Sequence, residues 1–218
     1  MKKKNLVVVV SAFVLLVAFF AAASYYQSHQ AAEAAKAYQR DKSTYLRDYS
    51  PTHGSTAAKV EIVEFFDPAC GTCREFYPLV ERLLQAHQGK VRLYLRYTPF
   101  HDGSEGVVKM LAAAHLQGKF WPTLEAVYAS QPGWAPGHRP QPELVWNYIG
   151  AVGLDLARLR QDMASPEIDK MIRQDLEDAR KLNVKATPEF FVNGKPLPSF
   201  GYEQLKTLVD DALASARR

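Results

Sequence analysis

Residues 63–73 read Val-Glu-Phe-Phe-Asp-Pro-Ala-Cys-Gly-Thr-Cys, and this stretch decides how the rest of the chain is interpreted. Cys70 and Cys73 are the only two cysteines among 218 residues. A disulfide between them would close a tiny loop and add little stability, so we expect the pair to serve chemistry. Gly71, which is followed by Thr72, permits a close approach of the two sulfurs.

The residues around the cysteines predict a strand–helix–strand unit. Residues 60–66 are β-branched and aromatic, which is typical of a buried strand. Residues 73–87 have apolar side chains at helical spacing on both sides of Pro78, which should kink the helix rather than end it. Residues 91–98 alternate apolar and polar side chains, as a strand does. Such a unit implies a right-handed parallel crossover, with Cys70 at the junction of strand and helix.

The remaining elements predict the order β-α-β, helices, β-β-α. Residues 103–183 favour helices, with Ser104 as an N-cap and Ser165-Pro166 as a later helix start. Asn193-Gly194 is a strong signal for a two-residue hairpin turn. The closing elements are expected at 190–192 (strand), 195–197 (strand) and 202–214 (helix).

The position of Cys70 suggests how it becomes reactive. Only a thiolate attacks a disulfide, and a free cysteine is mostly protonated at neutral pH. The unpaired N–H groups and the dipole of a helix N-terminus stabilise the anion. Cys73, one turn further on, is close enough to resolve a mixed disulfide.

The stretch 63–73 resembles the active-site entry of the thioredoxin superfamily, and its Glu-Phe-Phe opening is most similar to the DsbA branch. The resemblance implies a thioredoxin fold and an acidic side chain on the strand, six residues before the nucleophilic cysteine. Glu64 holds that place and could take a proton from Cys73. A carboxyl on an otherwise apolar strand should have a raised pKa. The alternative is that Glu64 lies on an edge strand and faces solvent.

A second stretch, residues 185–194, resembles the family segment in which Thr or Val precedes a cis-proline that faces the cysteines. It implies a cis bond between Thr187 and Pro188, with the Thr187 backbone turned toward a substrate segment. The alternative is an ordinary trans proline that opens a strand. The resemblance covers residues 59–216, and its DsbA-like form accounts for a helical insertion at about 103–183.

The N-terminus predicts export. Lysines at positions 2–4 precede an apolar run at 6–23, long enough for a bilayer, and place the N-terminus in the cytoplasm. Residues 1–24 are therefore a membrane anchor, or a signal peptide cut near Ala23. Residues 25–58 are interpreted as a stalk, partly helical through 31–47 and then flexible, and residues 59–218 as one domain.

Charge and histidine spacing argue against other classes of protein. The net charge of +4 includes three lysines of the N-terminal segment, which leaves +1 and no footprint for a nucleic acid. A CxxC pair can also be half of a zinc site, but none of the six histidines has ligand spacing to it. Each histidine is interpreted as a surface or helix residue, and no metal or other cofactor is expected.

The sequence thus predicts an exported thiol–disulfide oxidoreductase that acts on exported protein thiols, together with a membrane redox partner. Disulfide formation is the leading direction, although Gly71-Thr72 is not the Pro-His pair of strongly oxidising members. One alternative is a membrane-tethered reductase or isomerase with few clients. Another is a periplasmic module that holds a soft metal ion between Cys70 and Cys73.

Overall fold

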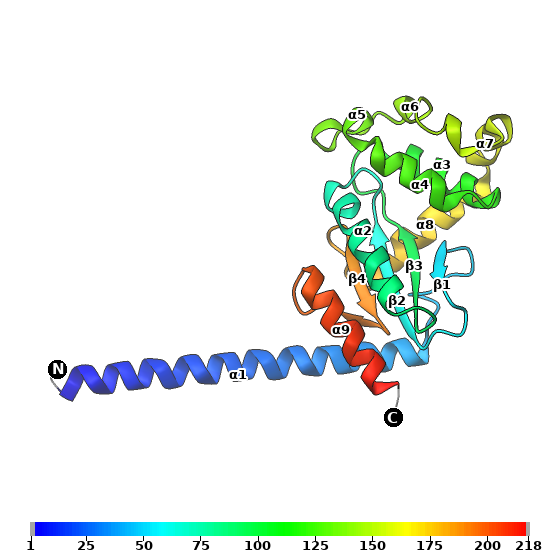
Figure 1. Cartoon of the computed structure of the whole chain (residues 1–218). Helices are drawn as coiled ribbons and strands as arrows, with labels where there is room; N and C mark the ends of the chain where they lie inside the picture. The colour runs from blue at the N-terminus through cyan, green and yellow to red at the C-terminus, as the bar shows by residue number, and fades with distance from the viewer. Residues whose placement is uncertain (1–2, 217–218) are drawn as a thin grey trace.

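The computed structural model describes residues 3–216, which form a five-stranded sheet with helices on both faces (Figure 1). In order across the sheet, the strands are β1 (Thr52–Gly54), β3 (Val91–Tyr97), β2 (Val60–Phe66), β4 (Glu189–Val192) and β5 (Lys195–Pro196). The α-helices are α1 (Lys3–Arg40), α2 (Gly71–Ala86), α3 (Ser104–Leu116), α4 (Phe120–Ala129), α5 (Gln131–Trp134), α6 (Pro142–Val145), α7 (Leu156–Met163), α8 (Pro166–Lys181) and α9 (Tyr202–Ser215), with 3-10 turns η1 (Pro136–His138) and η2 (Gly150–Val152).

The predicted strand–helix–strand unit is confirmed. β2 and β3 are parallel, with Val60 opposite Val91 and Phe66 opposite Tyr97. Helix α2 connects them and continues through Pro78. β4 pairs with β2 in the antiparallel direction, and the Asn193-Gly194 turn joins β4 to β5 as expected. The order of elements along the chain is therefore the predicted one.

The alternation of side chains on β2 divides the core between the two faces of the sheet. Val60, Ile62 and Phe66 belong to the larger apolar cluster, which includes side chains of α2, α3, α4 and α9. Val63 and Phe65 point to the other face and belong to a smaller cluster with residues of α1 and α8. β2 is therefore covered on both sides, which is why five of its seven side chains are apolar.

Helices α3 to α7 form the insertion and lie together at one end of the sheet (Figure 1). The insertion has its own buried anchor in Trp134, whose indole N–H donates to the carbonyl oxygen of Val127 at 2.9 Å. The prediction that Ser104 caps α3 was wrong, because Gly103 holds the N-cap position. The Ser104 hydroxyl instead donates to the buried carboxylate of Asp67 at 3.1 Å.

The N-terminal segment is one continuous helix of 38 residues, about 57 Å long. An 18-residue window of its apolar part has a mean hydropathy of 2.4 and is not buried against the rest of the protein. By length and composition this part could cross a membrane, and a signal sequence would have the same properties. Its N-terminal half projects away from the sheet (Figure 1).

The expected flexible link after the stalk was wrong. Helix α1 ends at Arg40 rather than 47, and residues 52–54 form the edge strand β1, antiparallel to β3. Tyr38 near the end of α1 is fully buried, and its hydroxyl donates to the Glu61 carboxylate. Lys42 adds an ion pair to Glu61 at 2.7 Å. Burial of aromatic rings on the sheet holds this segment in place, a long-range contact that local composition does not reveal.

A buried ion network holds the segment after α1 against α8. The Arg96 guanidinium is fully buried and contacts Asp175 and Asp178 at 2.7 Å each. It also donates to the carbonyl oxygens of Thr44 and Tyr45 at 3.0 and 2.7 Å. Residues 44–45 are thus bound through Arg96 to two aspartates of α8, on a strand face that the sequence pattern marked as polar.

Candidate active site

The two cysteines lie at the junction of β2 and α2, as predicted. Cys70 is the N-cap residue of α2, and both cysteines are free thiols. Cys70 is 4% exposed and Cys73 is fully buried, so Cys70 is the more accessible sulfur. The turn before them is built by Asp67, whose carboxylate accepts the Ala69 N–H at 2.9 Å and whose carbonyl accepts the Cys70 N–H at 3.0 Å.

The surroundings of the two sulfurs push their pKa values in opposite directions. The hydrogen bond from Cys73, with help from the backbone N–H groups of Cys73 and Thr72, lowers the pKa of Cys70 to about 5 against the opposing effect of burial. Burial, and then the hydrogen bond to Cys70, raises the pKa of Cys73. One sulfur is thus held as a thiolate at neutral pH while the other keeps its proton.

Glu64 lies on the central strand β2, between Leu95 of β3 and Phe190 of β4. The alternative of a solvent-facing edge carboxylate is therefore wrong, because Glu64 is only 4% exposed. Burial, together with the nearby Cys70 thiolate, raises the pKa of Glu64 to about 8. At neutral pH this carboxyl is mostly protonated and lies in the same part of the core as the two sulfurs.

The second motif comes together with the first. The bond between Thr187 and Pro188 is cis, and the Cys70 sulfur lies 3.2 Å from the Thr187 carbonyl oxygen. β4 begins directly after Pro188 and pairs with β2, which fixes the position of the Thr187 backbone. Gly71 and Thr72, the other two motif residues, form the first turn of α2 and are partly exposed.

Sequence reasoning missed a second set of residues at the site. The fully buried Asp67 carboxylate accepts from the His101 backbone N–H at 2.8 Å and contacts the His101 ring Nδ1 at the same distance. The ring Nε2 of His101 lies 3.2 Å from Nδ1 of His138, and the two rings are stacked. Gln131 of α5 donates to the carbonyl oxygens of Pro68 and Cys70.

These partners are separated by more than 30 residues, so no spacing in the sequence announces them. They come from the loop after β3 and from the insertion, which the topology carries back to the end of β2. His138 is exposed and lies in η1, and the His101 side chain is 25% exposed, which agrees with the interpretation as surface or helix residues. What the sequence did not reveal is that both adjoin the cysteine motif.

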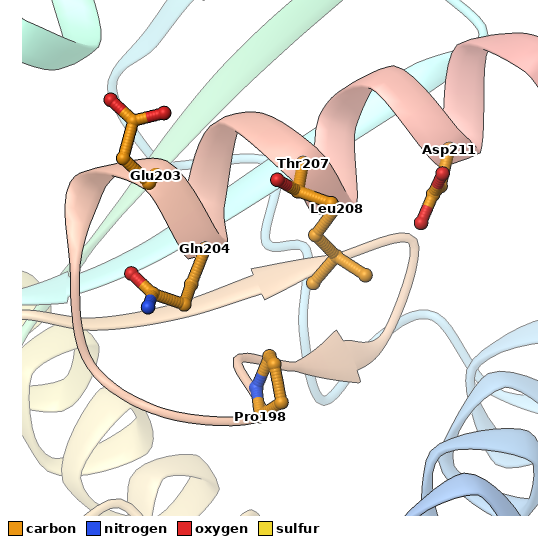
Figure 2. A pocket seen from close by; sticks show the side chains of 6 residues that line it. All are labelled: Pro198, Glu203, Gln204, Thr207, Leu208 and Asp211. Carbon is orange, nitrogen blue, oxygen red and sulfur yellow. The ribbon is translucent and has the colours of Figure 1, made fainter.

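A groove of about 420 Å³ lies beside the motif. Its walls come from the start of α2 and from α5 and η1, and its lining includes Ala69, Gly71, Arg74, Gln131 and His138. Another hollow lies against α9 and is lined by Pro198, Glu203, Gln204, Thr207, Leu208 and Asp211 (Figure 2). None of the motif residues lines that second hollow, so we assign it no part in the chemistry.

Comparison with known proteins identifies the family and the fold. Residues 46–211 match the family model described as Thioredoxin. The chain belongs to the thioredoxin family. A solved thioredoxin-like oxidoreductase from Silicibacter pomeroyi DSS-3 is 30% identical, with a TM-score of 0.68, and the match covers 81% of this chain and 98% of that one. The predicted thioredoxin fold with a helical insertion, of the DsbA-like kind, is confirmed.

Two curated relatives differ in kind and in how much of their length is matched. A probable disulfide bond formation protein D from Bacillus anthracis is 29% identical over 185 residues, which cover 80% of this chain and 84% of that protein. A Na(+)/H(+) antiporter NhaA from Herminiimonas arsenicoxydans is 32% identical over 145 residues, or 66% of this chain. The chain spans only 22% of that antiporter's length, so the antiporter name describes a much larger protein.

Proposed function

We propose that the protein is a thiol–disulfide oxidoreductase that forms disulfides in exported proteins. The observation that carries the proposal is the state of Cys70, which is the N-cap residue of α2 and whose pKa is lowered to about 5 by hydrogen bonds. Stabilising the thiolate stabilises the reduced protein, which makes the disulfide form the stronger oxidant. The disulfide bond formation protein of Bacillus anthracis, similar over most of its length, supports the same direction.

In the proposed reaction, a client thiolate attacks Cys70 of the oxidised protein. A client–Cys70 disulfide forms, the Cys70–Cys73 bond breaks, and its electron pair leaves on the Cys73 sulfur. Glu64, mostly protonated at neutral pH, can supply the proton that Cys73 takes up. A second client thiolate then attacks the client sulfur of the mixed disulfide and releases the Cys70 thiolate. The client has lost two electrons and the protein has gained them, without an added cofactor.

The backbone of Thr187, with Pro188 beside it, is the proposed docking edge for the client. The Thr187 carbonyl faces Cys70 at 3.2 Å and could pair with an extended segment of a client chain. Phe200, 55% exposed, packs its ring on Phe76 of α2 with centroids 4.7 Å apart. Such an exposed apolar surface would suit an incompletely folded client.

The reduction potential of the Cys70–Cys73 pair, from equilibration with glutathione, tests the direction. A value near roughly −120 mV supports disulfide formation, whereas roughly −270 mV moves the assignment to the membrane-tethered reductase. Cys70→Ser should abolish exchange with protein thiols, and a Cys70→Ser variant that still oxidises or reduces clients would disprove the mechanism.

A soft-metal module remains the alternative from another class of protein. Within residues 3–216, no group of three or more His, Cys, Asp or Glu side chains could hold a metal ion. A site there would have to use the two sulfurs alone. Stoichiometric, tightly bound Cu(I) in the purified reduced protein, without exchange activity, would favour this alternative.

We also propose that the domain lies on the periplasmic side of an inner membrane, held by residues 6–23, where a membrane redox partner would reoxidise it. The exposed apolar part of α1 supports this location. The intact mass of protein extracted from membranes distinguishes an anchor from a signal peptide cleaved near Ala23, because cleavage would remove the first 23 residues or so.

A further inference from the structure

Three side chains form a continuous chain of contacts from the buried turn to the groove beside the cysteine motif. We call Asp67, His101 and His138 the imidazole chain. Asp67 Oδ2 lies 2.8 Å from His101 Nδ1, and His101 Nε2 lies 3.2 Å from His138 Nδ1. Asp67 is fully buried, the His101 side chain is 25% exposed and His138 is exposed, so the chain runs outward from the core.

The chemistry of the groups fixes the direction of the hydrogen bonds. A carboxylate only accepts hydrogen bonds, so Nδ1 of His101 must carry the hydrogen that faces Asp67. In the neutral ring, His101 Nε2 is then an acceptor, and His138 Nδ1 must donate to it. His138 Nε2 therefore carries a lone pair. An aspartate orients a catalytic imidazole in the same way in serine hydrolases.

The free nitrogen faces the cysteine motif. A Cβ atom built on Gly71 would lie 3.5 Å from His138 Cε1 and 3.8 Å from Nε2, so the ring covers the face of Gly71. Ala69 and Gly71, the neighbours of Cys70 on either side, both line the same groove as His138. A thiol that enters the groove would thus lie beside the ring of His138 and next to both sequence neighbours of Cys70.

The other charged groups around His138 are cationic or lie behind it. Arg74 of α2 lines the groove, whereas Arg139, the next residue along the chain from His138, is not among the lining residues. The Asp67 carboxylate reaches His138 only through the ring of His101. An anion formed in the groove would therefore meet positive charge, which suits a site where a thiol becomes a thiolate.

We propose that His138 is a general base that takes the proton from a client thiol as its sulfur attacks Cys70 of the oxidised protein. The proton moves from the client sulfur to His138 Nε2, and the sulfur electron pair forms the bond to Cys70. The Cys70–Cys73 bond breaks, and its electrons stay on Cys73. His138 then releases its proton to solvent. The inference rests on the proposed function, because it needs the Cys70–Cys73 pair to exchange with thiols.

The size of the expected effect follows from the client thiol. A thiol with a pKa near roughly 8.5 is about 3% ionised at pH 7, so ionising it fully could speed attack by no more than about 30-fold. His138→Asn should therefore slow the reaction about 10-fold at pH 7. Asn suits this position because His138 has a positive φ of 60°, which Asn tolerates better than most residues.

The test follows reduction of the oxidised full-length protein by a cysteine-containing peptide, at pH 7 and at pH 10. At pH 10 the peptide is already a thiolate and needs no base, so His138→Asn should react like the unaltered protein. Arg139→Gln, in the same loop, is the matched control and should match the unaltered protein at both pH values. His101→Gln should lower the rate at pH 7 several-fold. The double variant His101→Gln/His138→Asn should react no more slowly than His138→Asn alone.

Other outcomes would overturn the proposal. An unchanged rate at pH 7, or an equal loss at both pH values, would show that His138 is no base. If the Cys70 pKa, measured from thiolate absorbance, shifted in the His138→Asn variant, the role of His138 would be to stabilise the Cys70 thiolate instead. If the unaltered protein does not react with the peptide even at pH 10, the proposed function itself fails, a result separable from both of these.

Discussion

The Cys70 sulfur lies 3.2 Å from the carbonyl oxygen of Thr187, although 117 residues separate the two in the chain. The contact exists because β4 pairs with β2, which sets Phe190 opposite Glu64. A client chain that pairs with the Thr187 backbone would thereby be aligned on the reacting sulfur.

The pKa of Cys70 predicts the pH dependence of its reactivity. Alkylation of the reduced protein by iodoacetamide should rise with pH and reach half its limiting rate near pH 5, where the thiolate forms. Because the hydrogen bond from Cys73 is the largest cause of the low pKa, Cys73→Ala should move the midpoint upward by about a unit or more. A midpoint near 9 in the unaltered protein would contradict the arrangement.

Glu64 should cost stability at neutral pH. Its pKa of about 8 in the folded protein lies above the ordinary 4.5, so unfolding lets the carboxyl ionise. The resulting loss of stability begins as pH rises through 4.5 and grows until about 8. Glu64→Gln keeps a neutral group and should raise the free energy of unfolding by about 2–3 kcal/mol at pH 7, and by almost nothing at pH 4.

Urea unfolding of the reduced protein at the two pH values measures this difference. Glu177→Gln, an exposed glutamate of α8, is the matched control and should change the free energy of unfolding by less than about 0.5 kcal/mol at either pH. If Glu64→Gln were equally stabilising at pH 4 and pH 7, ionisation could not be the cause.

Arg96 should be essential for stability. Arg96→Met leaves the buried carboxylates of Asp175 and Asp178 without their main partner and frees the carbonyls of residues 44–45. Loss of one member of a buried ion pair costs about 3–5 kcal/mol. Arg158→Met is the control: it breaks an exposed pair with Asp162 and should lower the free energy of unfolding by at most about 1 kcal/mol. Thermal and urea unfolding would both measure the difference between the two variants.

Gly194 should determine whether α1 stays docked on the sheet. It has a φ of +79°, and a Cβ there would collide with Tyr38. Gly89 has nearly the same φ, +77°, but nothing lies within 4 Å of its Cβ position. Gly194→Ala and Gly89→Ala share the backbone strain of about 1 kcal/mol, so the difference between them isolates the contact with Tyr38.

Hydrogen exchange over residues 36–50 is the measurement. Gly194→Ala should speed exchange there by an order of magnitude or more, whereas Gly89→Ala should leave it near that of the unaltered protein. Equal exchange in the two variants would mean that Tyr38 does not hold α1 against the β4–β5 turn.

Local patterns were sufficient for most of the sheet and for the cysteine motif. The bounds of β2 were predicted as observed, because a strand covered on both faces carries mostly apolar side chains, here five of seven. Asn193 and Gly194 both have positive φ, the conformation for which the hairpin turn selects these residues. Burial of Glu64 was harder to predict, since the same local sequence is compatible with an edge strand on which the carboxyl faces solvent.

The sequence by itself determined the order of elements, the CxxC motif and the proline motif, since each depends on side chains a few residues apart. Only the tertiary structure decided the docking of residues 41–54, the buried Arg96 network and the imidazole chain. Asp67, His101 and His138 lie far apart in the chain and meet because the insertion folds back over the end of β2. Contacts of this kind depend on how the chain closes on itself, and no local period or spacing encodes them.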